Sequence, residues 1–234
     1  MAEVPPIPRE DWIPALSKAG WDLVQDRIVR GLCHDLSGRG SSLGGLSFLL
    51  ESEPADLGPV VSHMGEELEH LERSLALLRL LPDDSTGEEL LAPTELIREI
   101  LELVSTQRGL ENVEFTVESA SDAPAIRIDP TFFRRSMILL LTGAAEAALL
   151  TGDRQVLVRA TKDEGRLLLE VTPGFPKGEE PEVDPGILPK RIVPKARIEV
   201  LLEVLQGKGI RAEGIGAGEE TGRLRLYFSP PSSA

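Results

Sequence analysis

Two leucine-rich stretches near the N-terminus repeat their apolar residues in steps of three and four. The first stretch, from about Trp21 to Leu50, places them at Val29, Leu32, Leu36, Leu43, Leu46 and Leu50, with Arg39 filling the same series. The second stretch places them at Val61, Met64, Leu68, Leu71, Leu75 and Leu78. This spacing predicts two long helices, each with one apolar stripe. Because Ser52–Gly58 has the composition of a short connection, we expect an antiparallel hairpin.

A lone hairpin of this kind would expose a long apolar surface to water. Pairing with a second copy would bury that surface inside a four-helix bundle. The sequence therefore predicts that residues 21–82 form the dimerisation part of a homodimer, and that residues 1–20 are an N-terminal extension.

Beyond a linker at Pro82–Gly87, the pattern changes to a mixture of helices and strands. Helices are predicted at Pro93–Gln107, Asp129–Leu150 and Lys195–Gly207. Strands are predicted at Val113–Glu118, Ala125–Ile128, Gln155–Thr161, Arg166–Thr172, Ile210–Ile215 and Leu224–Phe228. We therefore expect an α+β fold, in which residues 88–229 form an α/β sandwich after the hairpin and residues 230–234 form a tail.

The composition argues against several partners and compartments. With 39 acidic and 25 basic residues, the chain has a formal net charge of -14, which argues against nucleic acid or an anionic membrane as a partner. Cys33 is the one cysteine, so an internal disulfide is excluded and a reducing, cytoplasmic location is expected. No apolar run is long enough to cross a bilayer, and Met1–Glu10 lacks the apolar core of a signal peptide.

One histidine stands out in the first helix. His34 lies in the segment Gly-Leu-Cys-His-Asp-Leu, two residues from both Leu32 and Leu36. At about 100° per residue, this places the imidazole opposite the apolar stripe. An exposed imidazole beside the carboxylate of Asp35 could carry a phosphoryl group, with Asp35 orienting the ring or acting as a base. The alternative interpretation is an exposed histidine and a solvated aspartate without a role.

Other residues of the same helix are candidates for contact with a partner. Arg39 interrupts the apolar stripe, so its stem either reaches out of the bundle or brings the guanidinium to a partner or a phosphate. Helical phase adds Ser42, Gly45 and Leu49 to this candidate docking surface. Glycines inside the helix, such as Gly38, either let a partner approach the backbone or mark a bend.

The order helical hairpin, linker, α-β-β-α-β-β-loop-α-β-β resembles the core of the sensor histidine kinases over residues 21–229. That core joins a dimerisation and phosphotransfer hairpin to an ATP-binding domain of the GHKL, or Bergerat, type. Cys33–Leu36 is similar to the phospho-acceptor motif of the family, in which an acidic residue and a leucine follow the histidine. Asp129-Pro130-Thr131 resembles the segment that leads into the kinase N-box.

The nucleotide-binding elements of the family are missing. Leu139 and Gly143 stand where the family has asparagines that bind the magnesium of Mg-ATP, and magnesium prefers oxygen ligands. Thr172–Pro176 replaces the Asp-x-Gly-x-Gly motif that recognises adenine, and Arg191–Arg197 has no glycine to cradle phosphates. The resemblance therefore implies a degenerate GHKL-like domain that holds neither a cofactor nor a metal.

A phospho-acceptor hairpin joined to such a domain resembles the histidine phosphotransferases of the ChpT type. This resemblance implies a phosphorelay phosphotransferase, rather than an ATP-dependent kinase, in which His34 shuttles a phosphoryl group between receiver-domain aspartates. The partners would be response-regulator receiver domains, which bring their own magnesium. Two alternatives remain: a divergent but active sensor histidine kinase, and a non-catalytic pseudokinase scaffold that binds a response regulator.

Overall fold

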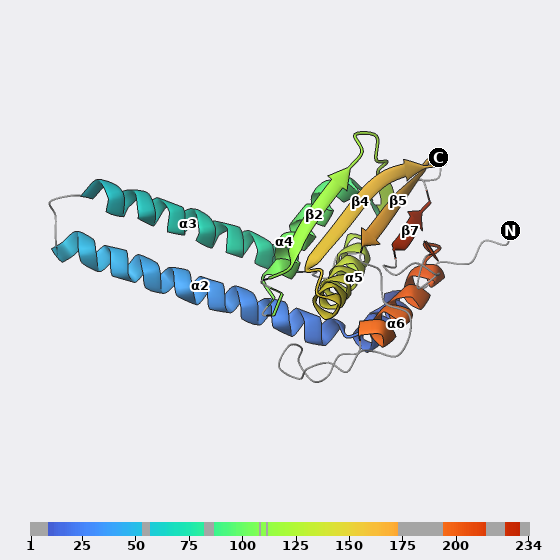
Figure 1. Cartoon of the computed structure of the whole chain (residues 1–234), viewed down its shortest axis with the longest axis horizontal. Helices are drawn as coiled ribbons and strands as arrows, with labels where there is room; N and C mark the ends of the chain where they lie inside the picture. The colour runs from blue at the N-terminus through green and yellow to red at the C-terminus, as the bar shows by residue number, and fades with distance from the viewer. Residues whose placement is uncertain are drawn as a thin grey trace.

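A long helical hairpin projects from one end of an α/β sandwich (Figure 1). This computed structural model describes residues 9–52, 57–81, 87–107, 109–110, 112–172, 194–213 and 223–229. The chain is α+β, with a helical N-terminal region followed by a mixed sheet, as the sequence predicted. None of the helices in these described ranges is both long and apolar enough to cross a bilayer.

The hairpin consists of α2 (Trp21–Ser52) and α3 (Leu57–Leu80), which run antiparallel and side by side (Figure 1). The glycines of α2 do not interrupt the helix. The stripe of α2 faces α3, since Leu32 is buried and Leu36 and Leu43 are half-buried. The predicted stripe of α3 divides in two: Met64, Leu71 and Leu78 are half-buried, whereas Val61, Leu68 and Leu75 are exposed. One neighbouring helix is too narrow to cover the whole stripe.

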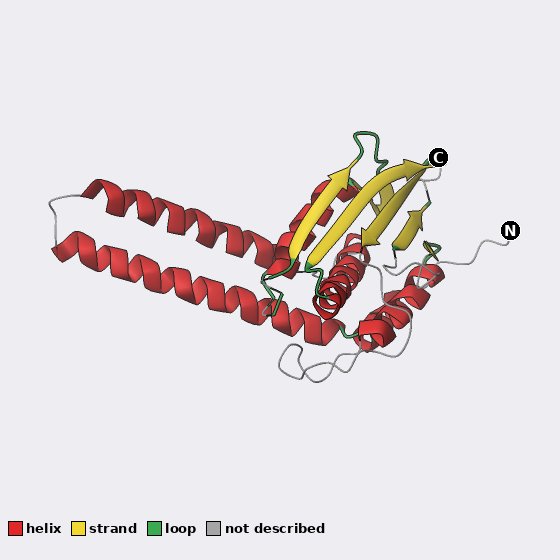
Figure 2. Cartoon of the chain, viewed as in Figure 1, coloured by secondary structure: helices red, strands yellow, loops and turns green. Residues whose placement is uncertain are grey.

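A five-stranded sheet forms one layer of the sandwich. In spatial order its strands are β2 (Glu114–Ser119), β4 (Gln155–Asp163), β5 (Arg166–Thr172), β7 (Leu224–Phe228) and β6 (Arg211–Glu213). β2 runs parallel to β4, and the other neighbours are antiparallel. The helices α4 (Pro93–Ser105), α5 (Pro130–Thr151) and α6 (Pro194–Gly207) cover one face (Figure 2). A separate pair, β1 (Glu89–Leu91) and β3 (Ile126–Ile128), is antiparallel.

Helix α5 is the centre of the core. The carboxylate of Asp129 caps its N-terminus by accepting a hydrogen bond from the backbone N–H of Phe132 at 2.9 Å. Gly152 ends the helix in the left-handed region, with φ of 78°. Between these caps, most side chains are buried against the sheet and the neighbouring helices. Alternate residues of β4, β5 and β7 supply the apolar side of the sheet.

The opposite face of the sheet carries a row of alternating charges. The row comprises Glu118, Arg159, Glu170, Arg225 and Glu213, one residue from each strand, and each stands opposite the next in the strand register. An Arg159 guanidinium nitrogen lies 2.6 Å from a carboxylate oxygen of Glu118 and another lies 3.9 Å from Glu170. Nε of Arg225 lies 2.9 Å from Glu170. This charge row gives the solvent-facing side of the sheet opposite-charge partners across every strand pair.

Two elements differ from the sequence expectation. Within the predicted N-terminal extension at residues 1–20 no element was predicted, and the structure has α1 (Arg9–Lys18) there, which packs on α6 and buries Leu16. β1 begins shortly after the predicted linker, whose residues 82–86 lie outside the described part of the chain. The expected tail at 230–234 also lies outside it, as do residues 173–193 of a loop that the sequence predicts at Pro173–Pro194.

Candidate functional site

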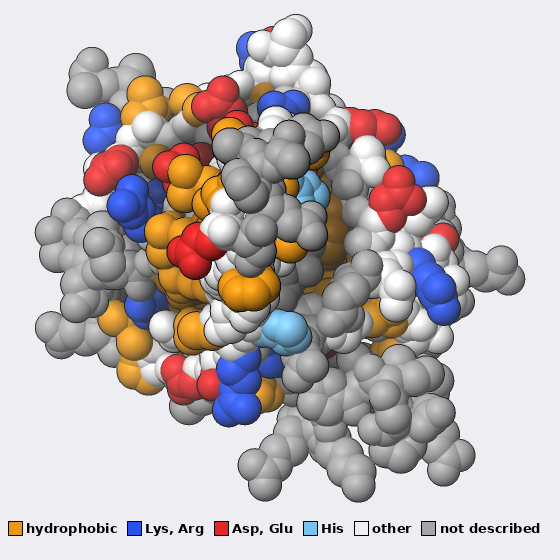
Figure 3. All heavy atoms as spheres, turned by 90° about the vertical axis from the view of Figure 1, so that its left-hand side faces the viewer, with side chains coloured by type: hydrophobic (Ala, Val, Ile, Leu, Met, Phe, Trp, Pro, Cys, Tyr) orange, Lys and Arg blue, Asp and Glu red, His pale blue; other side chains and the backbone are white. Residues whose placement is uncertain are grey.

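His34 lies on the exposed side of α2, as its helical phase predicted. Its side chain makes no hydrogen bond with any other described residue. Figure 3 looks at the molecule from the tip of the hairpin and shows histidine side chains at the surface, beside hydrophobic and charged ones. Because His34 is exposed, a second protein can reach its imidazole without any movement of the hairpin.

Asp35 points in a different direction from His34. Oγ of Ser74 in α3 donates a hydrogen bond of 2.5 Å to Oδ2 of Asp35. Nε of Arg39, one turn further along α2, lies 3.5 Å from Oδ1 of Asp35. Both carboxylate oxygens are therefore engaged within the hairpin. The expected contact between Asp35 and the ring of His34 is not among the hydrogen bonds of the described residues.

Arg39 extends this set of contacts across the two helices. Its Nη1 donates a hydrogen bond of 3.0 Å to Oε2 of Glu67, a buried residue of α3. This hydrogen bond raises the pKa of the Arg39 guanidinium above its ordinary value. We call Ser74, Asp35, Arg39 and Glu67 the hairpin network. It fixes the register and rotation of α2 against α3 close to His34, so Arg39 already has partners within the hairpin.

The remaining docking candidates are open to solvent. Ser42 and Gly45 are exposed, and Leu49 has 46% of its surface exposed. A methyl group placed on Gly45 would meet no atom within 4 Å. The three residues share one flank of α2, on the half of the helix that projects beyond the sandwich.

The base of the hairpin is fixed to the sandwich at several points. The backbone of α2 at Gly31 rests on the end of α4, where an added Cβ would lie 2.0 Å from the carbonyl oxygen of Thr106. Nη1 of Arg27 lies 2.6 Å from Oε1 of the buried Glu146 in α5. A third link joins Arg73 of α3 to Glu102 of α4 at 2.7 Å. Sequence reasoning missed this junction, although a glycine inside a helix was a signal for it.

The two positions that the sequence resemblance aligns with the kinase N-box, Leu139 and Gly143, lie inside the core. Leu139 is fully buried and Gly143 is buried beside it, one turn further along α5. Neither residue has a side-chain oxygen that could bind magnesium. Of the segments that stand in place of the family's adenine and phosphate motifs, residues 173–176 and 191–193 lie outside the described part of the chain.

No protein-family model matches the chain, and no curated protein matches it. Among solved structures, the chain is similar to the catalytic domain of the histidine kinase ThkA, with 18% identity and a TM-score of 0.45 over 62% of this chain and 97% of that one. It is similar to a bacterial phosphotransferase, with 15% identity and a TM-score of 0.43 over 87% and 95%. It is also similar to the Acinetobacter baumannii histidine kinase AdeS, with 11% identity and a TM-score of 0.39 over 84% and 97%.

Proposed function

We propose that the protein is a histidine phosphotransferase of a phosphorelay, in which His34 accepts a phosphoryl group from one receiver-domain aspartate and passes it to another. The observation that carries this proposal is the exposed imidazole of His34 on a hairpin whose base is fixed to the sandwich. A histidine kinase must bring its own nucleotide to its histidine. A fixed junction favours delivery of the phosphoryl group by a separate protein.

The chemistry requires little from this chain beyond position. A nitrogen of His34 attacks the phosphorus of a phospho-aspartate in line with the bond to the leaving carboxylate oxygen. The N–P bond forms, the P–O bond breaks, and the aspartate carboxylate is released. The reverse step passes the phosphoryl group to the next aspartate. Positioning and charge stabilisation dominate such transfers, and the receiver would supply the magnesium.

The other candidate residues have roles around this step. Asp35 orients His34 by holding α2 against α3 through the hairpin network, rather than by touching the ring. Arg39 supports the same network. The receiver docks along the flank of α2 that carries Ser42, Gly45 and Leu49, where open space lies next to the helix.

The protein acts as a homodimer in this proposal. Val61, Leu68 and Leu75 are 57%, 52% and 41% exposed and follow one another at seven-residue intervals along α3. Residues of α2 and α3 that face α4, such as Asp35 and Arg73, line the opposite flank of the hairpin. A second copy would bury the apolar flank and complete a four-helix bundle.

A transfer assay tests the function. Receiver domains from the source organism are phosphorylated on aspartate, freed of their donor and mixed with the protein. We expect the label to appear on the wild-type chain as acid-labile phosphohistidine, and the variant His34→Gln to remain unlabelled. His63→Gln is the matched control, because His63 is another exposed histidine of the hairpin and should leave transfer intact.

Each rival function has a distinct result in the same assay. Labelling of His34 by ATP without any receiver would identify an active kinase and contradict the proposal. Binding of a receiver that survives His34→Ala, with no transfer in the wild type, would identify a scaffold.

A further inference from the structure

Strand β2 forms one edge of the five-stranded sheet. Among the strands of the described residues it has one neighbour, β4, with which it pairs in parallel (Figure 1). The backbone N–H of Glu114 donates a hydrogen bond of 2.8 Å to the carbonyl oxygen of Arg154, just before β4. Backbone groups alternate in direction along a strand, so Phe115 and Val117 turn their N–H and C=O groups toward the outer edge. Such an edge is a template for one further strand.

A groove of about 450 Å³ lies between β2 and α4. Four apolar side chains line it, from α4, β2 and the residue before β2: Leu101, Val113, Phe115 and Val117. Helix α4 adds one charge of each sign, Arg98 and Glu102. Phe115 and Val117 are half-buried, whereas the residues opposite them on β4 are buried, with β2 on one side and β5 on the other. The apolar face of the sheet is therefore only partly covered at β2.

The outer face of the same edge is negative. The charge row alternates in sign from strand to strand and ends at Glu118 on β2. Arg159 on β4 is the opposite-charge partner of Glu118, whose side chain is 50% exposed. Glu114, four residues earlier on the same face, is also exposed. Continuing the alternation by one strand would place a basic residue opposite Glu118 and another opposite Glu114.

We propose that the edge of β2 binds an extended segment of a partner protein, in which basic and apolar side chains alternate. The segment pairs antiparallel with β2 and exchanges backbone hydrogen bonds with Phe115 and Val117. Its basic side chains face Glu118 and Glu114, and the apolar ones between them enter the groove beside α4. The formal net charge of -14 attracts such a segment from a distance. This inference does not rest on the proposed phosphotransfer.

A second copy of the chain fits this edge less well. Two β2 strands that pair antiparallel about Thr116 would place Glu114 of each copy opposite Glu118 of the other. Like charges directly opposite each other destabilise a strand pair. The charges of β2 therefore favour a basic partner segment over a second β2.

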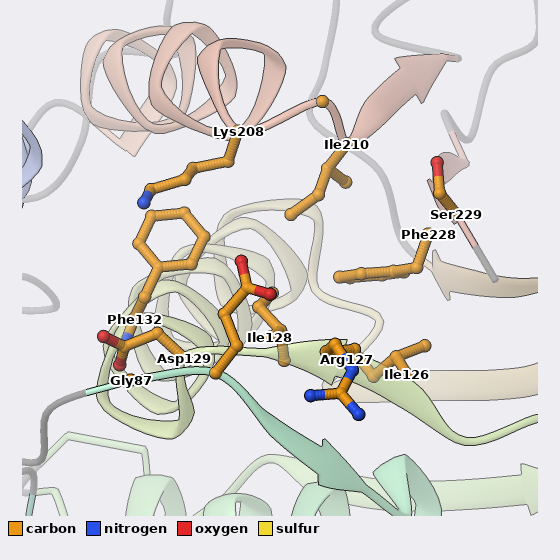
Figure 4. Close-up of a pocket in the computed structure, with 12 residues that line it drawn as sticks. Gly87, Ile126, Arg127, Ile128, Asp129, Phe132, Lys208, Ile210, Phe228 and Ser229 are labelled. Atoms are coloured by element: carbon orange, nitrogen blue, oxygen red, sulfur yellow. The ribbon is translucent and has the colours of Figure 1, made fainter. Parts of the chain in front are cut away.

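Other strands are too short for a segment of five residues. At the far edge of the sheet, β6 has three residues, and its Arg211 and Glu213 already form an ion pair with each other. A second hollow, of about 250 Å³, is lined by β3, the first turn of α5 and the end of α6 (Figure 4). Strand β3 also has three residues. Of these strands, β2 alone combines six residues with a groove beside it.

A fluorescently labelled peptide with the core Arg-Val-Thr-Val-Arg tests the proposal, and its anisotropy measures binding to the full-length protein. At low ionic strength we expect the peptide Glu-Val-Thr-Val-Glu to bind at least about fivefold more weakly. Glu118→Lys should weaken binding of the basic peptide by a similar factor. Glu213→Lys is the matched control, because it makes the same change of charge at the other end of the charge row. It should leave the affinity within about twofold, since salt screens distant exposed charges.

Backbone methylation of the basic peptide provides a second measurement that leaves the protein unchanged. In the antiparallel pairing both valines turn their N–H groups toward β2, and the threonine turns its N–H group away. N-methylation of both valines should weaken binding at least about tenfold, and N-methylation of the threonine should have less than about a twofold effect.

Three results would overturn the proposal. The first is a basic peptide that does not bind, or binds no better than the acidic one. The second is an equal effect of methylation at the valines and at the threonine. The third is dissociation of a wild-type dimer by the peptide, which would assign the edge of β2 to a second copy of the chain.

Discussion

At Gly31, the backbone of α2 comes so close to α4 that no larger residue fits. A Cβ there would lie 2.0 Å from the carbonyl oxygen of Thr106 and 2.9 Å from its carbonyl carbon. Both atoms belong to the backbone, so they cannot move aside as a flexible side chain would. Gly38, two turns further along the same helix, has no atom within 4 Å of the equivalent position. Helix α2 therefore contains one glycine that cannot carry a side chain without a shift of the backbone, and one that can.

This difference predicts opposite effects of two alanine substitutions. Gly31→Ala should lower the free energy of unfolding by about 1–3 kcal/mol, because the helix must shift to relieve the overlap. Gly38→Ala should raise it by up to about 1 kcal/mol, because alanine is the better helix former and nothing obstructs it. Urea unfolding followed by circular dichroism measures both. Equal effects of the two substitutions would show that the junction at Gly31 yields easily.

The sequence predicts single residues only where helical phase decides their position. His34 is exposed because it lies opposite the leucine stripe, which the spacing alone shows. The contacts of the Asp35 side chain, in contrast, do not follow from helical phase alone. Neighbours in a helix point about 100° apart, so a residue next to His34 in sequence need not touch its ring. The partner Ser74 follows from the register of α2 on α3, which the sequence does not reveal.

Among the elements, the sheet depends on charge as well as on apolar burial. Glu170 stands in the middle of the charge row, between Arg159 and Arg225 on the two neighbouring strands. Glu118 stands at the end of the row, on edge strand β2, and has Arg159 as its partner. The two glutamates therefore provide a central and a terminal position in the same row.

Glu170→Gln should destabilise the protein more than Glu118→Gln. The central substitution weakens two cross-strand pairs at once, and we expect a loss of about 1 kcal/mol at low ionic strength. The terminal substitution weakens one pair and should have about half that effect. Urea unfolding at low and high salt measures both, and the difference should shrink at high salt because ions screen exposed charges. A difference that salt leaves unchanged would mean that packing, not charge, makes Glu170 important.

Long elements were predictable, and so were the short strands β3 and β6, but α1 and β1 were not. The hairpin helices and the β4–β5 hairpin follow from patterns that extend over many residues, and the turn between the strands has Glu164 and Gly165 at positive φ. Helix α1 contains Pro14, which usually argues against a helix. Strand β1 has three residues, of which two are exposed, so no alternation marks it.

For the whole molecule, the proposed dimer rests on the exposed half of the α3 stripe. Leu68→Glu places a charge at the centre of that stripe and should shift the protein from dimer to monomer, because an unpaired buried charge strongly disfavours association. Leu90→Glu is the matched control, since Leu90 is 59% exposed against 52% for Leu68 but lies on β1 and not on the hairpin. Sedimentation velocity at micromolar concentrations measures both.

The oligomeric state of the wild-type protein decides how the results for the two variants are interpreted. A wild-type chain that sediments as a folded monomer would contradict the dimer. A dimer that resists Leu68→Glu, but dissociates with Leu90→Glu, would place the interface on the sandwich instead of the hairpin.

Helix α2 belongs to both parts of the molecule. Trp21, Val24, Ile28 and Leu32 are buried in the same core as the sandwich, and the helix then continues without a break to His34 and the tip. Replacement of the hairpin by that of another protein, through recombination or in an engineered chimera, would also remove the buried residues of α2 from the core of the sandwich. Unlike proteins assembled from interchangeable modules, this chain has no boundary within α2 at which the helix that carries His34 could be inherited separately. Its specificity would then have to evolve by substitution along the projecting half of α2.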